Sequence, residues 1–555
     1  MKRKWKEFLM RRPGPWGCFL AVSAVLWFYW IAEYRVVMWR GCFEELSDFG
    51  WRGIAFLLAA SAPVLLLPER ARKIWCGVLL WLMVPSMLLQ FYLAARFEMK
   101  MDATLVSVAA VSPAGEIREF AGEFFTPSLI GNTLLLLLPV LLVTLFCARS
   151  RGGASRAAKR TGALLLLPFL GYCAFFLVRW EPMEMLNCAT LTRFGKAGIE
   201  YASFHRRFID AVNRPELPGE LVRIPELPEN TIGIIVIGES ASRDQHSLYG
   251  YGRDTNPELS KLGEELLVFR DVLSPTVRTA SSLANVFTFA DLQHLNRPRC
   301  SFDVLLRAAG YRTALASNQW QWGAFDTPTS VLFKDAGFKC YLQYRKYRAF
   351  DDELIEQFPE EWWDGSQPTV LYIHLIGSHM PFSQRHPADF APFSGREDRY
   401  TAGMKPELAE LLNEYDNSIA FTDRVVAACI ERLRALKRPA FLLYFSDHGE
   451  AVAPGMEQFA VRNNRMAACY KIPFVLWLSP EYRAARPEFA ADAAGQTGAP
   501  HQTDRLIWSL ADLAGIRWNA FPEDESLFSK HYRPRPRFLQ EGAAPWPEEE
   551  NPARP

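Results

Sequence analysis

Hydrophobic residues are distributed unevenly along the 555-residue chain. Five long apolar runs crowd the first 180 residues, at about residues 16–32, 50–67, 74–95, 128–148 and 161–178. A helix of about 20 mostly apolar residues crosses a bilayer, so this succession predicts a transmembrane domain of five helices over residues 1–180. The second run reaches a spanning length only if the residues just before Gly53 belong to it. For any single run, a buried helix of a soluble domain or a re-entrant segment is the alternative.

The loops between these runs alternate in their content of Lys and Arg. The N-terminal MKRKWKEFLMRR, the PERARK loop at 68–73 and the loop at 149–160 are basic, whereas the loops at 33–52 and 96–127 are mixed or acid-leaning. Short basic loops stay in the cytoplasm, which predicts a cytoplasmic N-terminus and an exported chain after residue 179. No small-residue cleavage site follows the first run, so we expect it to remain as a span.

Beyond residue 180, short apolar runs are separated by charged and proline-rich sequence. Residues 181–230 are predicted to form an interfacial segment and then a linker, in which four prolines exclude a regular helix. Residues 231–531 alternate apolar strands with helical stretches such as 301–309 and 405–436, which predicts an α/β domain with a mostly parallel central sheet covered by helices on both faces. The tail, 532–555, is predicted to be flexible. The predicted strands are 232–237, 266–272, 313–316, 369–375, 440–445 and 473–478.

Composition narrows the classes of partner and of site. The formal net charge of +1 gives no electrostatic reason to expect a nucleic-acid partner. The cysteines of the exported part are scattered without close spacing, which excludes a metal knuckle and a dense disulfide framework but leaves one or two bridges open. These five cysteines are Cys188, Cys300, Cys340, Cys429 and Cys469.

Ionisable and polar side chains follow most of the predicted strands at the point where each strand ends. In an open α/β sheet, ligands bind beyond the carboxyl ends of the strands. Any one of these residues alone is commonly a turn residue, a helix cap or a structural histidine, but their joint placement indicates a site. Carboxylate and imidazole groups suit zinc or manganese, and a hydroxyl beside such an ion is a nucleophile for phosphorus. In chain order the residues are Glu239, Thr276, Thr279, Asn318, Gln319, His379, Asp447 and His448.

Five strings occur in a fixed order: GESASRDQHSLYGYGRDTNPEL, SNQ, HLIGSHMPF, EYDNSIAFTD and FSDHGE. Together they resemble the phosphoethanolamine transferases of bacterial inner membranes, which belong to the alkaline phosphatase/sulfatase superfamily. The resemblance covers about residues 238–515 and implies five membrane helices followed by a periplasmic catalytic domain. It also implies zinc as the cofactor, with manganese as the second choice.

The resemblance assigns a role to each residue of the site. Glu239, Asp447 and His448 are expected to bind the metal. Thr279 is expected to be the nucleophile and to contact the metal, with Thr276 and Ser281 as weaker candidates. A further three residues are expected to contact the substrate: His379 at the phosphate or as an acid/base, and Asn318 and Gln319 in the pocket wall.

The implied reaction transfers phosphoethanolamine from phosphatidylethanolamine, through a covalent threonine, to lipopolysaccharide (core sugar or lipid A) or another periplasmic glycan. Two departures from the family pattern favour the core-sugar branch. No cysteines frame SPTVRTASS, and no histidine follows soon after SDHGE, where Arg462 or His501 are the candidate substitutes.

Three alternatives stay open at this point. A phosphatase or phosphodiesterase of the same superfamily would use water as the acceptor, whereas a sulfatase is disfavoured because SPTVRTASS lacks the cysteine that such an enzyme modifies. A phosphoglycerol transferase shares the five spans and the threonine. A non-catalytic membrane sensor with a decayed site is the alternative from a different class.

Overall fold

The structure of the protein is a computed structural model that divides into two compact units, Met1–Ser203 and Phe204–Pro555. Most of the predicted loop at 96–127 and the candidate Arg462 lie outside the described residues. The residues that the structure describes are 12–39, 46–97, 101, 106, 125–180, 182–294, 299–319, 331–345, 349–396, 398–452, 466–539 and 545–546.

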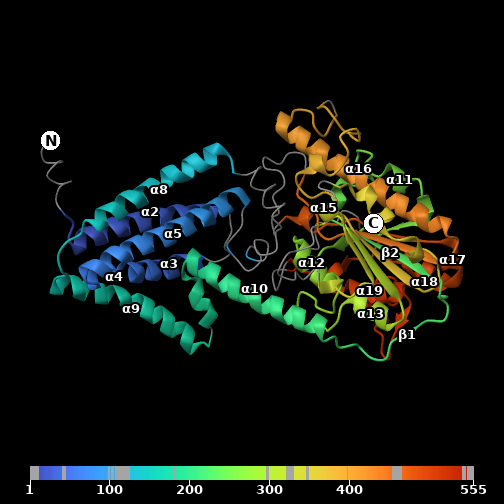
Figure 1. The fold of residues 1–555 in the computed structure, drawn as a ribbon, viewed down its shortest axis with the longest axis horizontal. Helices are drawn as coiled ribbons and strands as arrows, with labels where there is room; N and C mark the ends of the chain where they lie inside the picture. The colour runs from blue at the N-terminus through green and yellow to red at the C-terminus, as the bar shows by residue number, and fades with distance from the viewer. Residues whose placement is uncertain are drawn as a thin grey trace. The chain divides into compact units, whose positions relative to one another are not determined.

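The first unit is a bundle of apolar helices (Figure 1). Within it, α2 packs against α5, α5 against α8, and α3 against α9. The helices are α2 (Pro15–Trp39), α3 (Leu46–Ser61), α4 (Pro63–Leu66), α5 (Glu69–Phe97), α8 (Pro127–Ala148) and α9 (Arg156–Val178).

Four of the five predicted spans are confirmed as helices long and apolar enough to cross a membrane. The described residues contain these at Pro15–Val37, Glu69–Ala95, Pro127–Ala148 and Arg156–Val178. The second run instead forms α3 and the short α4, which begins at Pro63. Proline has no backbone N–H and suits the first turn of a new helix, so the apolar sequence is divided between two helices.

The chain after α9 folds back onto the bundle. The 3₁₀ helix η1 (Pro182–Cys188) contacts α3 and α9, and the Tyr172 hydroxyl donates hydrogen bonds to the carbonyls of Glu184 (2.9 Å) and Met185 (3.0 Å). The long helix α10 (Thr190–Asn213) follows. The segment predicted to be interfacial therefore begins as a cap on the helices of the first unit.

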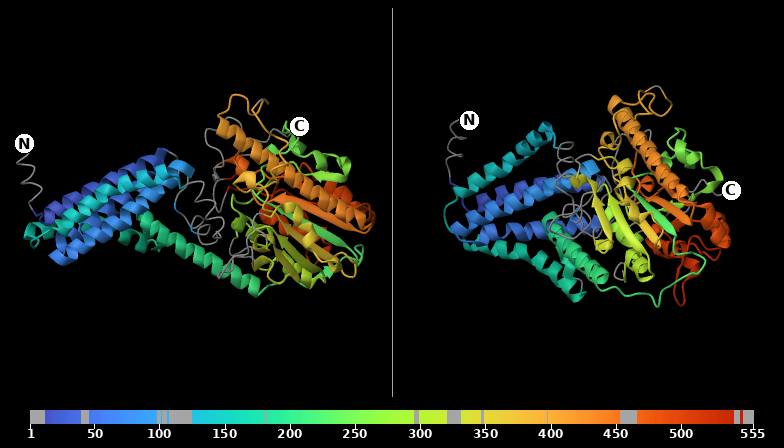
Figure 2. Two further views of the ribbon diagram at one scale, coloured as in Figure 1. Left: turned by 45° about the horizontal axis from the view of Figure 1, so that its top comes forward. Right: turned by 45° about the vertical axis from the view of Figure 1, so that its right-hand side comes forward.

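The second unit is built on a seven-stranded sheet with the strand order β3-β9-β8-β2-β7-β5-β6 (Figure 2). Five strands, β8 to β6 in this order, are mutually parallel, whereas β9 runs antiparallel to both β8 and β3. The seven-stranded sheet is therefore mostly parallel, as predicted, and the antiparallel strand β9 makes it a mixed sheet. The strands are β2 (Ile232–Gly238), β3 (Leu266–Val268), β5 (Arg312–Ser317), β6 (Phe338–Tyr341), β7 (Thr369–His374), β8 (Ala440–Ser446) and β9 (Phe474–Leu478).

Helices cover both faces of this sheet, as predicted. All seven residues of β2 are buried. Ile235 and Ile237 join a core with α12, α13 and α19, whereas Ile234 and Val236 join a second core with α16. Figures 1 and 2 show α16 on one side of the sheet and the other three helices on the opposite side. These helices are α12 (Thr279–Val286), α13 (Phe302–Ala308), α16 (Pro406–Ala435) and α19 (Leu506–Leu513).

Parts of the predicted linker and tail pack on the second unit. Val222–Arg223 forms β1, which pairs with β11 (Ile516–Arg517). In the tail, buried Arg537 forms an ion pair with Asp271 at 2.7 Å. Among the described residues, none of the five cysteines of the exported part forms a disulfide bridge in the structure.

The GYGRDTNPEL string holds helix α16 in place. Arg253 donates from Nη1 to Asp416 Oδ2 (2.7 Å) and from Nη2 to Asn413 (2.8 Å). Asp423, also on α16, accepts hydrogen bonds from the backbone N–H groups that begin α11 (Pro257–Ser260), at 2.7 Å from Glu258. Residues of two strings that carry the family resemblance, GYGRDTNPEL and EYDNSIAFTD, thus contact each other directly.

Arg253→Met is expected to lower the free energy of unfolding by about 3–5 kcal/mol, because removing one partner leaves a buried charge uncompensated. The Asp416 side chain is 0% exposed. Chemical denaturation of the full-length protein, followed by tryptophan fluorescence, measures the change. Arg434→Met is the matched control: its ion pair with Glu265 is exposed, and its loss is expected to cost less than about 1 kcal/mol. Equal costs for the two variants would contradict this account.

Candidate metal centre

Glu239, Asp447 and His448 meet beyond the ends of two neighbouring strands. Strands β2 and β8 run parallel, with Gly238 paired to Ser446, so the residues that follow them emerge side by side. One ligand atom of each of the three residues lies within 4.8 Å of the others. His448 Nε2 is 3.5 Å from Glu239 Oε1 and 3.4 Å from Asp447 Oδ2. The structure therefore brings the three predicted ligands together.

The donor atoms of this cluster fit a divalent metal ion. Asp447 Oδ1 accepts from the backbone N–H of His448 (2.7 Å), whereas the buried Oδ2 has no hydrogen-bond partner among the described residues. The Gly449 carbonyl lies 2.8 Å from His448 Nδ1, which favours the tautomer that directs the Nε2 lone pair towards the carboxylates. Two carboxylates and one imidazole are a zinc or manganese donor set.

Burial raises the free energy of the charged side chains in this cluster. Desolvation, with the neighbouring charge of Glu239 second, raises the pKa of Asp447 to about 7. Two buried carboxylates this close repel each other. A bound divalent cation would offset the two negative charges and reverse this balance. The cluster is therefore electrostatically complementary to a cation.

Among the three candidate nucleophiles, Thr279 lies at the predicted ligands. It is the first residue of α12, and its Oγ1 donates to Glu239 Oε2 at 2.9 Å. The Thr276 and Ser281 hydroxyls instead bond to each other at 2.8 Å. The first turn of α12 adds the partial positive charge of a helix N-terminus, which partly offsets the two carboxylates close to the Thr279 hydroxyl.

The loop that carries His379 is held against Glu239. The Ser378 N–H donates to the Glu239 carbonyl at 2.9 Å. Gly377 has φ +49°, and a Cβ there would lie 2.8 Å from the same carbonyl oxygen, so this close approach requires glycine. His379 follows at a partly exposed position, with Nδ1 2.8 Å from the Met380 carbonyl.

Asn318 and Gln319 have different surroundings. Gln319 Nε2 donates to Glu239 Oε2 (3.3 Å) and to the Leu375 carbonyl (3.0 Å). Asn318 is fully buried, and its Nδ2 donates to Asp351 Oδ1 at 2.9 Å. Asp351 in turn accepts from the backbone N–H groups of Ile376 and Gly377. Gln319 therefore touches a predicted ligand, whereas Asn318 braces the His379 loop through Asp351.

Two residues that the sequence did not single out shape the site. Ser240 has φ +58°, a region that non-glycine residues rarely adopt, and its Oγ donates to Glu239 Oε1 at 2.7 Å. The Tyr415 hydroxyl donates to the Ser240 carbonyl and accepts from the Ser242 N–H, both at 2.8 Å. Ser240 lies in the string GES and Tyr415 in EYDNSIAFTD, so the quoted strings already pointed to both residues. Asp351 lies outside the quoted strings, and nothing in the sequence indicated its contact with the His379 loop.

His501, a candidate substitute for the family's additional histidine, lies in strand β10 (His501–Gln502), which pairs with β4 (Val272–Leu273). Its Nδ1 is 2.9 Å from the Tyr532 hydroxyl. Burial, with nearby arginines second, lowers the pKa of His501 to about 3, so the ring is neutral. These contacts are with β-strand and tail residues and not with the three predicted ligands.

Comparison with known proteins agrees with the motifs. The sulfatase family profile matches residues 232–516. Phosphoethanolamine transferase EptC of Escherichia coli K12 is 30% identical over 319 residues, which cover 55% of this chain and 54% of EptC. The match thus spans about half the length of the curated relative. The resemblance to phosphoethanolamine transferases that the strings indicate is confirmed.

Solved structures show the same fold. The C-terminal periplasmic domain of E. coli EptC, crystallised in complex with Zn, superposes with a TM-score of 0.56 at 28% identity, over 61% of this chain and 98% of that domain. Lipooligosaccharide phosphoethanolamine transferase A of Neisseria meningitidis, an integral membrane protein, gives a TM-score of 0.66 over 92% of this chain and 98% of its own. Its 17% identity makes this a likeness of fold. Because the profile covers half of its length, the chain belongs to the sulfatase family.

Proposed function

We propose that the protein is a zinc-dependent phosphoethanolamine transferase of a bacterial inner membrane, with phosphatidylethanolamine as the donor. The observation that carries this proposal is the 2.9 Å contact between Thr279 Oγ1 and Glu239 Oε2, within the buried cluster of Glu239, Asp447 and His448. The curated relatives named as phosphoethanolamine transferases support the transferred group.

In the first step, Thr279 Oγ attacks the phosphorus of the donor. The new Oγ–P bond forms as the bond between phosphorus and the diacylglycerol oxygen breaks, and that oxygen receives the proton that the threonine loses. When bound, zinc supplies Lewis-acid chemistry at the reacting oxygens. The N-terminus of α12 and the fixed N–H groups around Glu239 hold the site in shape, so that little reorganisation accompanies the reaction.

In the second step, a hydroxyl or phosphate oxygen of the acceptor attacks the phosphorus. The Oγ–P bond breaks, and Thr279 regains a proton. We assign this proton transfer, or a contact to the phosphate, to His379, whose partly exposed ring stands on the loop braced by Asp351. Gln319 and Asn318 hold Glu239 and this loop, respectively. We propose lipopolysaccharide (core sugar or lipid A) or another periplasmic glycan as the acceptor.

The proposed membrane organisation follows from the charge pattern. We propose five spans over residues 1–180, with α3 and α4 together forming the second, an N-terminus in the cytoplasm, and a periplasmic catalytic domain at 231–531. Residues 181–230 would connect the two, with α10 along the membrane surface, where exposed Phe194 and Ile199 meet lipid. Confinement to the surface that holds the donor raises its effective concentration.

Membranes containing the full-length protein, incubated with headgroup-labelled phosphatidylethanolamine, test the function. Label on the protein, and then on lipopolysaccharide, is the expected result. Release of free phosphoethanolamine without labelled glycan would instead indicate a phosphodiesterase. The absence of any reaction with zinc or manganese added would indicate a non-catalytic protein and overturn the proposal.

A further inference from the structure

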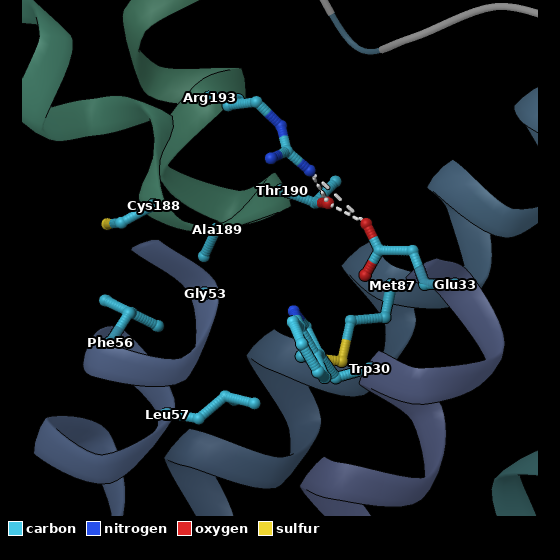
Figure 3. A pocket seen from close by; sticks show the side chains of 10 residues that line it. All are labelled: Trp30, Glu33, Gly53, Phe56, Leu57, Met87, Cys188, Ala189, Thr190 and Arg193. Carbon is cyan, nitrogen blue, oxygen red and sulfur yellow. Dashed lines mark hydrogen bonds and ion pairs between the residues drawn. The ribbon is translucent and has the colours of Figure 1, made fainter. Parts of the chain in front are cut away.

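The first unit contains a small cavity that the proposed reaction does not use. It lies between α2, α3, α5 and the start of α10 (Figure 3). Glu33, Thr190 and Arg193 form its polar wall, and Trp30, Gly53 and Met87 are among the residues opposite. We call this cavity the Glu33 pocket.

The polar wall centres on a buried carboxylate. Glu33 is 2% exposed and is the only acidic residue in α2. Its Oε1 accepts from the Thr190 hydroxyl and from Arg193 Nη2, the latter at 3.3 Å. Arg193 Nη2 also donates to Thr190 Oγ1 at 2.6 Å. These contacts use one carboxylate oxygen, and Figure 3 shows the other, Oε2, on the side of Trp30 and Met87.

Stability alone does not account for this arrangement. A buried ion pair is often no more stable than apolar residues of the same volume, and an ionisable residue inside a membrane span marks a functional site by default. Glu33 stands four residues before the end of the apolar stretch Pro15–Val37. That end of α2 is the one that the basic loops predict to be outer, where lipid headgroups lie.

The shape and chemistry of the pocket favour a small cation. The free space takes roughly one water-sized group, which matches a primary ammonium group but not a trimethylammonium group. A carboxylate oxygen beside an indole ring attracts such a cation by charge and by cation–π contact. Gly53 makes room for the ring, since a Cβ there would lie 2.5 Å from Trp30 Nε1.

We propose that the Glu33 pocket binds the primary ammonium group of a phospholipid headgroup, with Glu33 Oε2 as the counter-charge and Trp30 as the ring beside it. Arg193 and Thr190 hold the carboxylate in place. The inference rests on the proposed function, in which a lipid with this headgroup is the donor. The pocket selects the lipid by its headgroup, and the metal centre carries out the transfer.

Native mass spectrometry of the full-length protein in detergent, with equimolar phosphatidylethanolamine and phosphatidylcholine, tests the pocket. The wild type is expected to retain phosphatidylethanolamine at least about fivefold more than phosphatidylcholine. Glu33→Gln is expected to bring the two lipids within about twofold of each other. Glu69→Gln, which removes an exposed carboxylate paired with Lys73, is the matched control and is expected to keep the wild-type ratio.

A second variant covers the case in which Glu33→Gln does not fold. Ala189→Leu fills the pocket from its wall while leaving the charges in place, and it is expected to lose the preference as well. Soluble phosphoethanolamine in excess separates two sources of the ammonium group: displacement of lipid indicates recognition of the headgroup alone, and no displacement indicates recognition of the headgroup on its lipid. Both outcomes support the ammonium site.

Two results overturn the inference: a wild type that does not distinguish the two lipids, or a preference that survives both pocket variants. Headgroup transfer by the same preparations is measured separately. If the wild type transfers label and the pocket variants keep their lipid preference, the proposed role of the Glu33 pocket is contradicted and the proposed function is not. If the lipid preference depends on Glu33 but the wild type shows no transfer, the proposed function is contradicted and the ammonium site is supported.

Discussion

Thr279→Ala is expected to abolish labelling of the protein by headgroup-labelled phosphatidylethanolamine and to lower transfer to the acceptor by at least about 10³-fold. The variant loses the hydroxyl that we propose as the nucleophile, whereas the proposed metal ligands Glu239, Asp447 and His448 are unchanged. Zinc content, measured by elemental analysis of the purified protein, is therefore expected to stay near the wild-type value.

Thr276→Ala is the matched control for this experiment. It removes the same chemical group three residues earlier, but the Thr276 hydroxyl bonds to Ser281 and to the Arg278 carbonyl. Covalent labelling is expected to persist in this variant. Wild-type turnover by Thr279→Ala, or loss of label only in Thr276→Ala, would assign the nucleophile to another residue.

The parts of the fold that follow from local pattern were predictable from the sequence. The unbroken apolar run at 232–237 predicts a strand buried on both faces, and β2 is such a strand in the centre of the sheet. Strands β2 and β8 are parallel neighbours, so their carboxyl ends lie side by side and Glu239, Asp447 and His448 follow them at the same end of the sheet. The site was accessible to sequence reasoning for this reason.

Other features depend on contacts between distant residues, and no local pattern encodes them. The direction of β9 is an example, since an apolar run reads the same in a parallel and an antiparallel strand. Strand β6 (Phe338–Tyr341) was missed because its four residues form a short edge strand with an exposed lysine. The bracing of the His379 loop by Asp351 was also missed, because it requires knowing that residues 351 and 376–377 meet.

Removal of the metal by a chelator is expected to eliminate transfer and to lower the melting temperature of the second unit, and added zinc is expected to reverse both. Without a cation, two buried carboxylates face each other, and burial has already raised the pKa of Asp447. A ligand that binds only the folded state adds about 4 kcal/mol at 1,000 times its Kd, so the melting temperature is expected to rise with zinc concentration. Thermal unfolding at several zinc concentrations, together with transfer assays, measures both effects.

Two carboxylate variants make this experiment specific to the predicted ligands. Asp447→Asn keeps the size of the side chain but removes the charge, and its melting temperature is expected to stop responding to zinc. Glu414→Gln removes a carboxylate that bonds to His386 outside the cluster, and the response to zinc is expected to remain. A zinc response that survives in Asp447→Asn would show that the ion binds elsewhere. Since the proposed reaction needs the ion beside Thr279, such a result would remove the electrostatic basis for this residue as the nucleophile.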